Sequence, residues 1–280
     1  MSLKFTIREP VVDLREKPEE FRTSGYAHEK GRLTQLLFGE KVEVLKAQEE
    51  WVSIQALEQM RYSSERGWHP YIGWVKREEL TLREIEGPNT HVVKTPSFRI
   101  ESHELVLSYG TYLTVNPLGE ILLPDGEVGY GDLSALRPLY TPFSRSMLIE
   151  EAHLFLKVPY LWGGRSFPLK GKISSVDCSG IVQLLYRGQG ILIPRDASDQ
   201  SKKARAASKL LPGDLLYLAK EERINHVLLK GEDNLFLEAP ETGKKVRLLT
   251  WGKDLWEEEG RIAFADRPHT YHPFPAKFLS

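Results

Sequence analysis

Cysteine is almost absent from this sequence. Its 280 residues contain one, Cys178, so no disulfide can form within the chain, and the fold does not depend on an oxidising compartment. An excess of charge of either sign is also lacking, because 38 Lys and Arg face 39 Asp and Glu and leave a formal net charge of -1. Without a basic surface we expect neither nucleic acid nor an anionic membrane as the main partner.

Long apolar runs are missing too. No stretch approaches the ~18 apolar residues that a membrane span requires, so no span is predicted. The first ten residues have charges from Lys4 onward and lack the apolar core of a signal peptide, which favours a cytoplasmic protein. Metal motifs such as Cys-x-x-Cys or His-Glu-x-x-His do not occur, and the spacing around His269 and His272 suggests no third ligand. We expect no metal and no cofactor.

The length predicts two or three domains. Up to about residue 143, short strand-like runs alternate with turn residues, as at 11–15, 35–40, 42–45, 51–54 and 71–75. Such spacing is typical of small all-β barrels or sandwiches. A turn-rich break at 86–90 precedes a second series that starts at 91, passes 105–113 and ends near 133. We therefore predict two β modules, over 1–85 and 86–143.

Helical spacing first appears after residue 143. The run Ser146–Leu156 has a capping serine and early acidic residues, and a second helix is predicted from Cys178 to about 188 or 190. Strands are expected at 214–218, 226–230, 235–239 and 261–265. Helices followed by a strand meander indicate an α+β domain over 144–280.

Cys178 lies at the predicted start of the second helix. Unpaired backbone N–H groups and the positive end of the helix dipole favour a thiolate at such a position, which makes the sulfur a nucleophile. Its neighbours Asp177, Ser179 and Gly180 are poor core residues. The alternative is that Cys178 is a small buried hydrophobic residue, which is the common role of a free cysteine.

A thiol nucleophile needs a base, and His226 opens a predicted strand hairpin. If this hairpin is symmetric about Glu232, Glu238 lies directly opposite His226, at the ~4.5–5.5 Å Cβ separation that permits a hydrogen bond. The carboxylate would then orient the imidazole and favour the imidazolium. A shift of one residue would instead move Glu238 to the other face, and a purely structural histidine is the alternative.

Several motifs occur in a specific order within 146–280, and together they resemble the NlpC/P60 family of papain-like cysteine peptidases, which cleave bacterial cell-wall peptides. They are Pro159-Tyr160-Leu161-Trp162-Gly163-Gly164, Asp177-Cys178-Ser179-Gly180, Ile193-Pro194-Arg195-Asp196, Pro212-Gly213-Asp214-Leu215 and Asn225-His226-Val227. The resemblance implies Cys178 as nucleophile, His226 as base and Glu238 as orienting partner. The family usually has His, Asn or Gln at this third position, so Glu238 is a departure.

The same resemblance implies roles for residues around the nucleophile. Tyr160 would supply an oxyanion donor together with the Cys178 backbone N–H. Trp162 would contact substrate, and Asp177 and Ser179 would line the D-Glu subsite. Arg195 could pair either with an acidic group of the substrate or with a neighbouring aspartate.

The first β module resembles bacterial SH3-like (SH3b) domains through Leu36-Leu37-Phe38-Gly39-Glu40, Trp51-Val52-Ser53-Ile54 and Gly73-Trp74-Val75; the second module matches only loosely. Two SH3b modules before an NlpC/P60 domain resemble γ-D-glutamyl-diamino acid endopeptidases. In these enzymes the first module forms a wall of the cleft, and acidic groups receive the free amine of an N-terminal L-Ala. The candidates here are Glu40, Tyr71 and Asp196. The family often has serine where this chain has Ala197.

The predicted function is hydrolysis, through a Cys178 acyl-enzyme, of the bond between γ-D-Glu and meso-diaminopimelate or Lys in peptidoglycan stem peptides. The predicted partner is therefore an L-Ala-γ-D-Glu-diamino acid peptide. Two alternatives stay open at this stage. One is a non-catalytic peptidoglycan-binding or scaffold protein, and the other is an acyl transferase that uses the same dyad.

Overall fold

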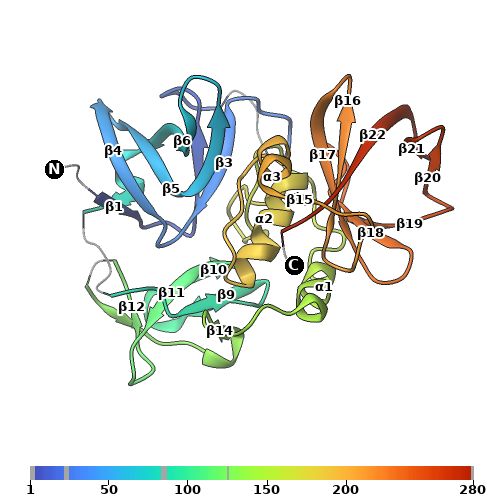
Figure 1. Ribbon diagram of the computed structural model, residues 1–280. Coiled ribbons are helices and arrows are strands. Elements are labelled where there is room, and N and C mark those ends of the chain that lie inside the picture. The colour runs from blue at the N-terminus through green and yellow to red at the C-terminus, as the bar shows by residue number, and fades with distance from the viewer. Residues whose placement is uncertain (1–3, 22–24, 83–86, 125, 279–280) are drawn as a thin grey trace.

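Most of the regular secondary structure is β-strand. The computed structural model describes residues 4–21, 25–82, 87–124 and 126–278. Within these ranges it has three α-helices, α1 (Arg145–His153), α2 (Cys178–Gly188) and α3 (Ala197–Lys203). Figure 1 shows α2 and α3 between the N-terminal sheets and the C-terminal sheet. Among the described residues, no helix combines the length and apolar character that crossing a membrane requires.

A seven-stranded antiparallel sheet occupies the first module, in the order β3-β2-β6-β5-β4-β1-β7. Its strands are β1 (Lys4–Ile7), β2 (Val11–Arg15), β3 (Arg32–Leu37), β4 (Lys41–Gln48), β5 (Trp51–Ser63), β6 (Gly67–Lys76) and β7 (Leu80–Thr81), with a 3-10 turn at Arg77–Glu79. The strand predicted at 51–54 extends to Ser63, because β6 pairs with it along most of its length. The module boundary predicted at 85/86 lies outside the described residues.

The second module has a two-stranded and a five-stranded sheet. Its strands are β8 (His91–Val93), β9 (Ser97–Ile100), β10 (Leu105–Ser108), β11 (Tyr112–Val115), β12 (Ile121–Leu122), β13 (Val128–Gly129) and β14 (Leu136–Pro138), with 3-10 turns at Glu101–His103 and Leu133–Ala135. The apolar run 105–113 is divided between two strands, because Gly110 has a φ of 81° and the Thr111 N–H turns back to the Ser108 carbonyl. This positive φ is where glycine is favoured.

An eight-stranded sheet follows the helices, in the order β19-β18-β17-β16-β22-β21-β20 with β15 beside β22. The strands are β15 (Arg205–Ala206), β16 (Leu215–Lys220), β17 (Arg223–Lys230), β18 (Leu235–Glu238), β19 (Arg247–Thr250), β20 (Leu255–Glu258), β21 (Arg261–Phe264) and β22 (Arg267–Lys277). The predicted strands near 214, 226, 235 and 261 are all present, whereas α3, β19, β20 and β22 were not predicted. Prolines at 268, 273 and 275 disguise β22, since proline is rare inside strands.

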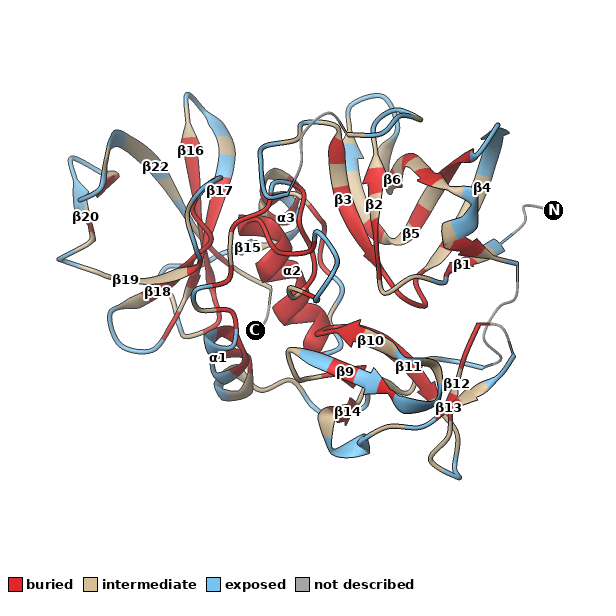
Figure 2. Ribbon diagram, turned by 180° about the vertical axis from the view of Figure 1, so that it is seen from behind, coloured by how far each residue is buried: buried red, intermediate tan, exposed pale blue. Residues whose placement is uncertain are grey.

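The first helix begins earlier than the sequence suggested. The N-cap is Ser144, not Ser146, because Ser144 has extended backbone and its side chain accepts a hydrogen bond from the Met147 N–H. The second helix agrees with the prediction and ends at Gly188. Every residue of α2 is buried, as the red ribbon in Figure 2 shows, so this helix is the centre of the largest apolar cluster.

The register of the β17–β18 hairpin differs from the symmetric prediction. Leu229 faces Leu237 and Lys230 faces Phe236, so the hairpin is centred one residue later than Glu232. Each residue of β17 is therefore opposed by a residue two positions later in the sequence than the symmetric hairpin predicted. A shift of two keeps every side chain on its predicted face, because side chains alternate with a period of two. Glu238 thus remains on the face of His226 as a diagonal neighbour.

Candidate active site

The N-terminus of α2 presents the only thiol of the chain to a cleft. Asp177 is the N-cap, and its Oδ1 accepts a hydrogen bond of 2.7 Å from the Gly180 N–H. Cys178 is the first helical residue and is 8% exposed, at the wall of the cleft. This first turn is the positive end of the helix dipole, so the thiol lies at the end of α2 where helices bind anions.

His226 and Glu238 form a hydrogen-bonded pair next to this thiol. His226 Nε2 lies 2.9 Å from Glu238 Oε1, and both residues are buried. Burial alone would lower the pKa of His226, but hydrogen bonds and charges from Cys178 and Glu238 outweigh it and raise this pKa to about 9. Because Nε2 faces the carboxylate, Nδ1 is left for the thiol, so the arrangement supports a thiolate-imidazolium pair.

Two arginines that the sequence did not single out lie behind this pair. Glu238 accepts hydrogen bonds from Arg247 Nε at 2.9 Å and from Arg267 Nη2 at 2.8 Å. Burial alone would raise the pKa of Glu238, but the hydrogen bond from His226 and the charges of His226, Arg267 and Arg247 lower it to about 2. The charge pairing across the β18–β19 hairpin could have been found only if β19 had been predicted.

The cleft has a volume of about 890 Å³ and is enclosed by both the first β module and the C-terminal domain. From the predicted set it is lined by Tyr71, Tyr160, Trp162, Asp177, Cys178, Ser179, Asp196 and His226. Sequence reasoning missed His28, Lys30, Arg32, Arg223 and Glu241, which also line it. These are charged or aromatic residues outside the recognised motifs, so the sequence carried no local signal for them.

Tyr160 and Trp162 lie on the same loop at the cleft. Tyr160 is held by its backbone N–H, which donates to the Lys244 carbonyl at 2.9 Å, and only 6% of it is exposed. Burial and the neighbouring Cys178 and Asp177 raise the pKa of its hydroxyl, so it stays a hydrogen-bond donor. Trp162 is 41% exposed and packs against His28 of the first module, with ring centroids 4.7 Å apart.

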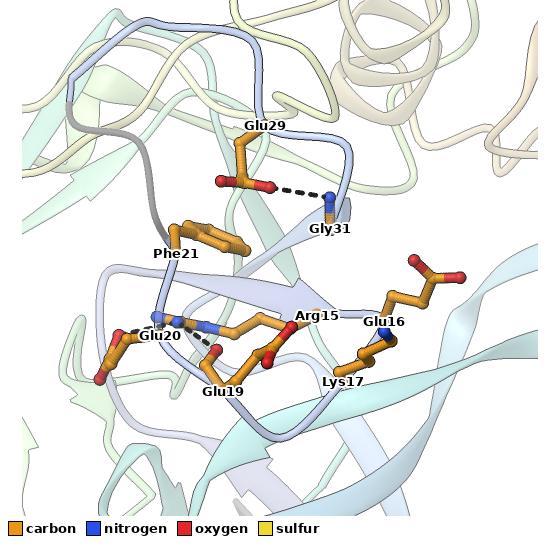
Figure 3. Close-up of a pocket in the computed structure, with 8 residues that line it drawn as sticks. All are labelled: Arg15, Glu16, Lys17, Glu19, Glu20, Phe21, Glu29 and Gly31. Carbon is orange, nitrogen blue, oxygen red and sulfur yellow. Dashed lines mark hydrogen bonds and ion pairs between the residues drawn. The ribbon is translucent and has the colours of Figure 1, made fainter.

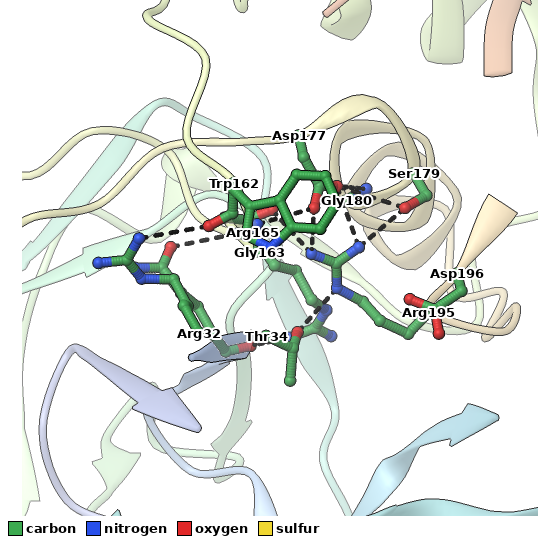
Figure 4. A network of polar contacts seen from close by, with 12 residues as sticks. Arg32, Thr34, Trp162, Gly163, Arg165, Asp177, Ser179, Gly180, Arg195 and Asp196 are labelled. Atoms are coloured by element: carbon green, nitrogen blue, oxygen red, sulfur yellow. Dashed lines mark hydrogen bonds and ion pairs between the residues drawn. The ribbon is translucent and has the colours of Figure 1, made fainter. Parts of the chain in front are cut away.

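Arg195 pairs with Asp177 rather than facing the cleft (Figure 4). Its Nη1 and Nη2 donate to the two Asp177 oxygens at 3.0 and 2.8 Å. The remaining N–H groups donate to Ser179 Oγ, the Gly164 carbonyl and Thr34 Oγ1. With all five donors used and 1% of the residue exposed, Arg195 has nothing left for a substrate carboxylate. The aspartate alternative is the one that this structure shows.

Tyr71 of β6 and Asp196, the N-cap of α3, meet across the cleft. The Tyr71 hydroxyl donates to Asp196 Oδ2 at 2.5 Å. Burial raises the pKa of Asp196, even though the charge of Arg195 and the hydrogen bond from Tyr71 oppose this. Ala197 and Ser198 continue the same wall. A half-buried carboxylate beside a hydroxyl is suited to a substrate cation, because a cation would offset the partial desolvation of its charge.

The position of Glu40 contradicts its predicted contact with the substrate amine. Glu40 is 1% exposed and does not line the cleft. Its carboxylate forms an ion pair with the buried Arg165, accepts from Gln59 Nε2 at 3.1 Å and lies 3.9 Å from Arg187. Glu40 therefore stabilises the contact between the first module and the catalytic domain.

A smaller pocket of about 140 Å³ lies in the first module (Figure 3). Two of the acidic residues that line it have partners, because Glu20 pairs with Arg15 at 2.8 Å and Glu29 accepts from the Gly31 N–H at 3.1 Å. Neither Cys178 nor His226 lines it. The cleft at α2 is therefore the candidate active site.

Comparison with known proteins agrees with this geometry. The model of the NlpC/P60 family matches residues 157–263. Over 245 residues the chain is 34% identical to a gamma-D-glutamyl-L-lysine dipeptidyl-peptidase of Bacillus subtilis (strain 168), covering 81% of this chain and 78% of that protein. A protein of the same name from Bacillus cereus is 29% identical, covering 77% of this chain and 69% of the relative.

A solved structure extends the likeness to the whole fold. The crystal structure of an NlpC/P60 family protein from Bacillus cereus superposes with a TM-score of 0.79, covering 99% of this chain and all of that chain at 22% identity. At this identity the structure supports the fold, while the Bacillus subtilis relative supports the family. The chain therefore belongs to the NlpC/P60 family and is a peptidase of that family.

Proposed function

We propose that this chain hydrolyses the bond between γ-D-Glu and a diamino acid, either Lys or meso-diaminopimelate, in peptidoglycan stem peptides that carry a free N-terminal L-Ala. The observation that carries the proposal is the position of Cys178 at the start of α2, beside the His226–Glu238 pair and within the cleft. The names of the two Bacillus relatives support the γ-D-glutamyl specificity and the release of a dipeptide.

Acylation uses the thiolate-imidazolium pair. The Cys178 sulfur attacks the γ-carbonyl carbon, and a C–S bond forms while the carbonyl oxygen becomes an oxyanion. The Cys178 backbone N–H and the Tyr160 hydroxyl are the proposed donors to that oxyanion. When the C–N bond breaks, His226 gives its proton to the departing amine of the diamino acid. Glu238 stabilises the imidazolium until that transfer.

Deacylation returns the enzyme to its starting state. Neutral His226 takes a proton from water, the hydroxide attacks the thioester carbon, and the C–S bond breaks to regenerate the thiolate. The dipeptide L-Ala-γ-D-Glu is formed as a carboxylic acid, which loses its proton to solvent and leaves as a carboxylate. An acyl transferase would differ only here, because an amine would take the place of water.

The Tyr71–Asp196 pair is the proposed site for the substrate ammonium. Asp196 supplies the negative charge and Tyr71 fixes the orientation of the Asp196 carboxylate, while Glu40 plays no part.

Tyr71 belongs to the first module, so the proposed ammonium site needs that module. We also propose that residues 1–85 and 86–143 form two SH3b-like barrels that precede a catalytic domain at 144–280 in the sequence. A free amine would then be required because an acylated one brings no charge to the half-buried Asp196 carboxylate.

Product analysis by mass spectrometry tests the proposal. The wild type is expected to release Lys or meso-diaminopimelate from L-Ala-γ-D-Glu-diamino acid tripeptides, and Cys178→Ala or His226→Ala to release none. Acetylation of the L-Ala amine is expected to slow the wild type by about 10²-fold or more through loss of a buried charge contact. Asp196→Asn is expected to lose most of that preference.

The controls separate the parts of this proposal. Alkylation of the single thiol by iodoacetamide shows whether the nucleophile is reactive in each preparation that keeps Cys178. A folded, alkylatable enzyme that leaves every tripeptide intact would refute the substrate assignment. Equal rates on free and acetylated peptide would refute the ammonium site alone, and a product joined to an added amine would favour the acyl transferase.

A further inference from the structure

The ionisation state of Glu238 decides whether His226 can serve as a base. The Glu238 side chain is fully buried, with 0% exposed. A buried carboxyl without nearby cations takes up a proton, because burial penalises the charge. A protonated Glu238 could donate to Nε2 of His226, which would place the ring proton on Nδ1, toward the thiol. The ring would then be in the wrong tautomer to accept a proton from Cys178.

Two arginines keep this carboxylate surrounded by positive charge. Arg267 Nη2 lies 2.8 Å from Glu238 Oε1 and 3.1 Å from Oε2. Arg247 Nε and Nη2 lie 2.9 and 2.8 Å from Oε2. With His226 on Oε1, the carboxylate has partners on both oxygens, so its rotamer is fixed as well as its charge.

Asp266 connects the two arginines. Its Oδ2 lies 2.8 Å from Arg247 Nη1, and its Oδ1 lies 3.2 Å from Arg267 Nε. The four side chains therefore form a closed ring of two anions and two cations. Arg247 is set directly opposite Glu238 in the β18–β19 register, and Arg267 begins β22. Asp266 and Arg267 lie beyond residues 157–263, the part that matches the family model.

Other charged groups near the dyad have partners of their own. On α3, which packs against β17, Asp199 pairs with Lys202 at 2.8 Å. Lys244 pairs with Asp266 and Glu241. Cys178 from α2 hydrogen-bonds to His226, and Tyr160 and Arg223 line the same cleft as His226. Within the described part of the chain, the ion pairs of Glu238 are those with His226, Arg247 and Arg267.

We propose that Arg247 and Arg267, tied together by Asp266, are positioning residues that allow a glutamate to serve as the orienting partner of His226. They keep Glu238 ionised and acceptor-only, hold its rotamer, and offset part of its charge so that His226 can still release its proton to the leaving amine. The inference rests on the proposed roles of Cys178 and His226. It explains why a carboxylate can stand where the family usually has His, Asn or Gln.

The first experiment removes one cation at a time. Arg267→Gln and Arg247→Gln are compared with Arg261→Gln, which removes the same charge from the neighbouring strand β21, where the arginine binds Thr270 and His272. The pKa of His226 is read by NMR of labelled histidine, and kcat/KM is measured across pH. Thermal unfolding shows that each variant is folded.

After loss of one arginine, the other still keeps Glu238 ionised but less of its charge is offset, so the pKa of His226 is expected to rise by about half a unit or more. The alkaline limb of kcat/KM moves upward with it, and kcat near neutral pH falls because the imidazolium holds its proton more tightly. Arg267→Lys keeps the charge and should stay close to the wild type. Arg261→Gln should change neither quantity.

A second experiment tests compensation directly. Glu238→Gln leaves two cations beside the imidazolium, so His226 loses its proton at lower pH and kcat/KM falls by about 10²-fold. Arg267→Gln is expected to lower activity in the wild type but to raise it in the Glu238→Gln background. A merely structural arginine would lower activity in both.

Two results would overturn the inference. The first is a His226 pKa that is the same in Arg267→Gln and Arg247→Gln as it is in Arg261→Gln. The second is an equal loss of activity when Arg267→Gln is introduced into the wild type and into Glu238→Gln. The NMR measurement needs no substrate, so it still decides the inference if the proposed peptide is not cleaved. Conversely, Cys178→Ala could be inactive while Arg267→Gln and Arg247→Gln keep the His226 pKa and the activity of the wild type. That result would support the proposed function and refute the inference alone.

Discussion

At the scale of single residues, the site depends on which polar groups are already paired. Arg195 and Glu40 both belong to motifs that suggested substrate contact, yet each is buried with its hydrogen-bonding capacity committed to protein partners. Asp196, in contrast, lies at the cleft with a hydroxyl as its partner. A motif gives the type of a side chain, and only the contacts show whether that side chain is free to meet a ligand.

The pH dependence of activity follows from His226. Its pKa of about 9 lies above the ordinary value of 6.5, so the imidazolium persists below about pH 9 and is lost as pH rises through that value. The stability gained from the pair is therefore complete below about pH 6.5 and disappears toward pH 9. We expect kcat/KM to fall with a midpoint near pH 9.

A pH–rate profile with a thermal melt at each pH checks this expectation. Glu238 has a pKa of about 2 and stays ionised throughout, so it does not shape the alkaline limb. An alkaline midpoint near 6.5 in a protein that is still folded would contradict the raised pKa of His226.

At the scale of elements, the start of α2 is fixed by a close backbone crossing. Gly180 lies against the Gly164 carbonyl, and a Cβ at position 180 would come within 2.1 Å of that oxygen. Because the obstacle is backbone, the helix or the loop that carries Tyr160 and Trp162 would have to move. Cys178 is only two residues away, so its position depends on this crossing.

Gly180→Ala is therefore expected to destabilise the protein by about 1–3 kcal/mol. Its kcat is expected to fall by about 10²-fold, since a displacement of about 1 Å at a nucleophile has an effect of that size. Gly31→Ala is the matched control, because the nearest atom to its added Cβ is 3.4 Å away and its φ is not positive. Denaturant unfolding and kcat measurements compare the two, and equal behaviour would show that the crossing is not needed.

At the scale of the whole molecule, a buried ionic network joins the first module to the catalytic domain. Glu40 pairs with Arg165, and Arg187 of α2 pairs with Glu58 of β5 at 2.6 Å. Thr34 also receives a hydrogen bond from Arg195 at 2.7 Å. The first module, which contributes Tyr71 to the wall of the cleft, is therefore held in place by contacts that include α2, the helix that begins at Cys178.

Glu40→Gln is expected to lower the free energy of unfolding by about 3 kcal/mol, because it leaves Arg165 buried without its counter-charge. Glu9→Gln, which removes the exposed pair with Lys172, is the control and should change stability by less than about 0.5 kcal/mol. Urea unfolding monitored by tryptophan fluorescence measures both. A Glu40→Gln protein as stable as the control would show that the network does not hold the modules together.

The sequence by itself determined the α+β character of the C-terminal half and the helix that starts at Cys178, and it named Cys178, His226 and Glu238 as candidates for thiol, base and carboxylate, because period, capping and motif order are local properties. It did not reveal the hairpin register, β19 and β22, or the two arginines around Glu238. Those depend on which strands become neighbours, and the prolines of β22 disguise one of them. Tertiary structure also decided that Asp196 faces the cleft while Glu40 does not, since burial and pairing arise only when the modules pack together.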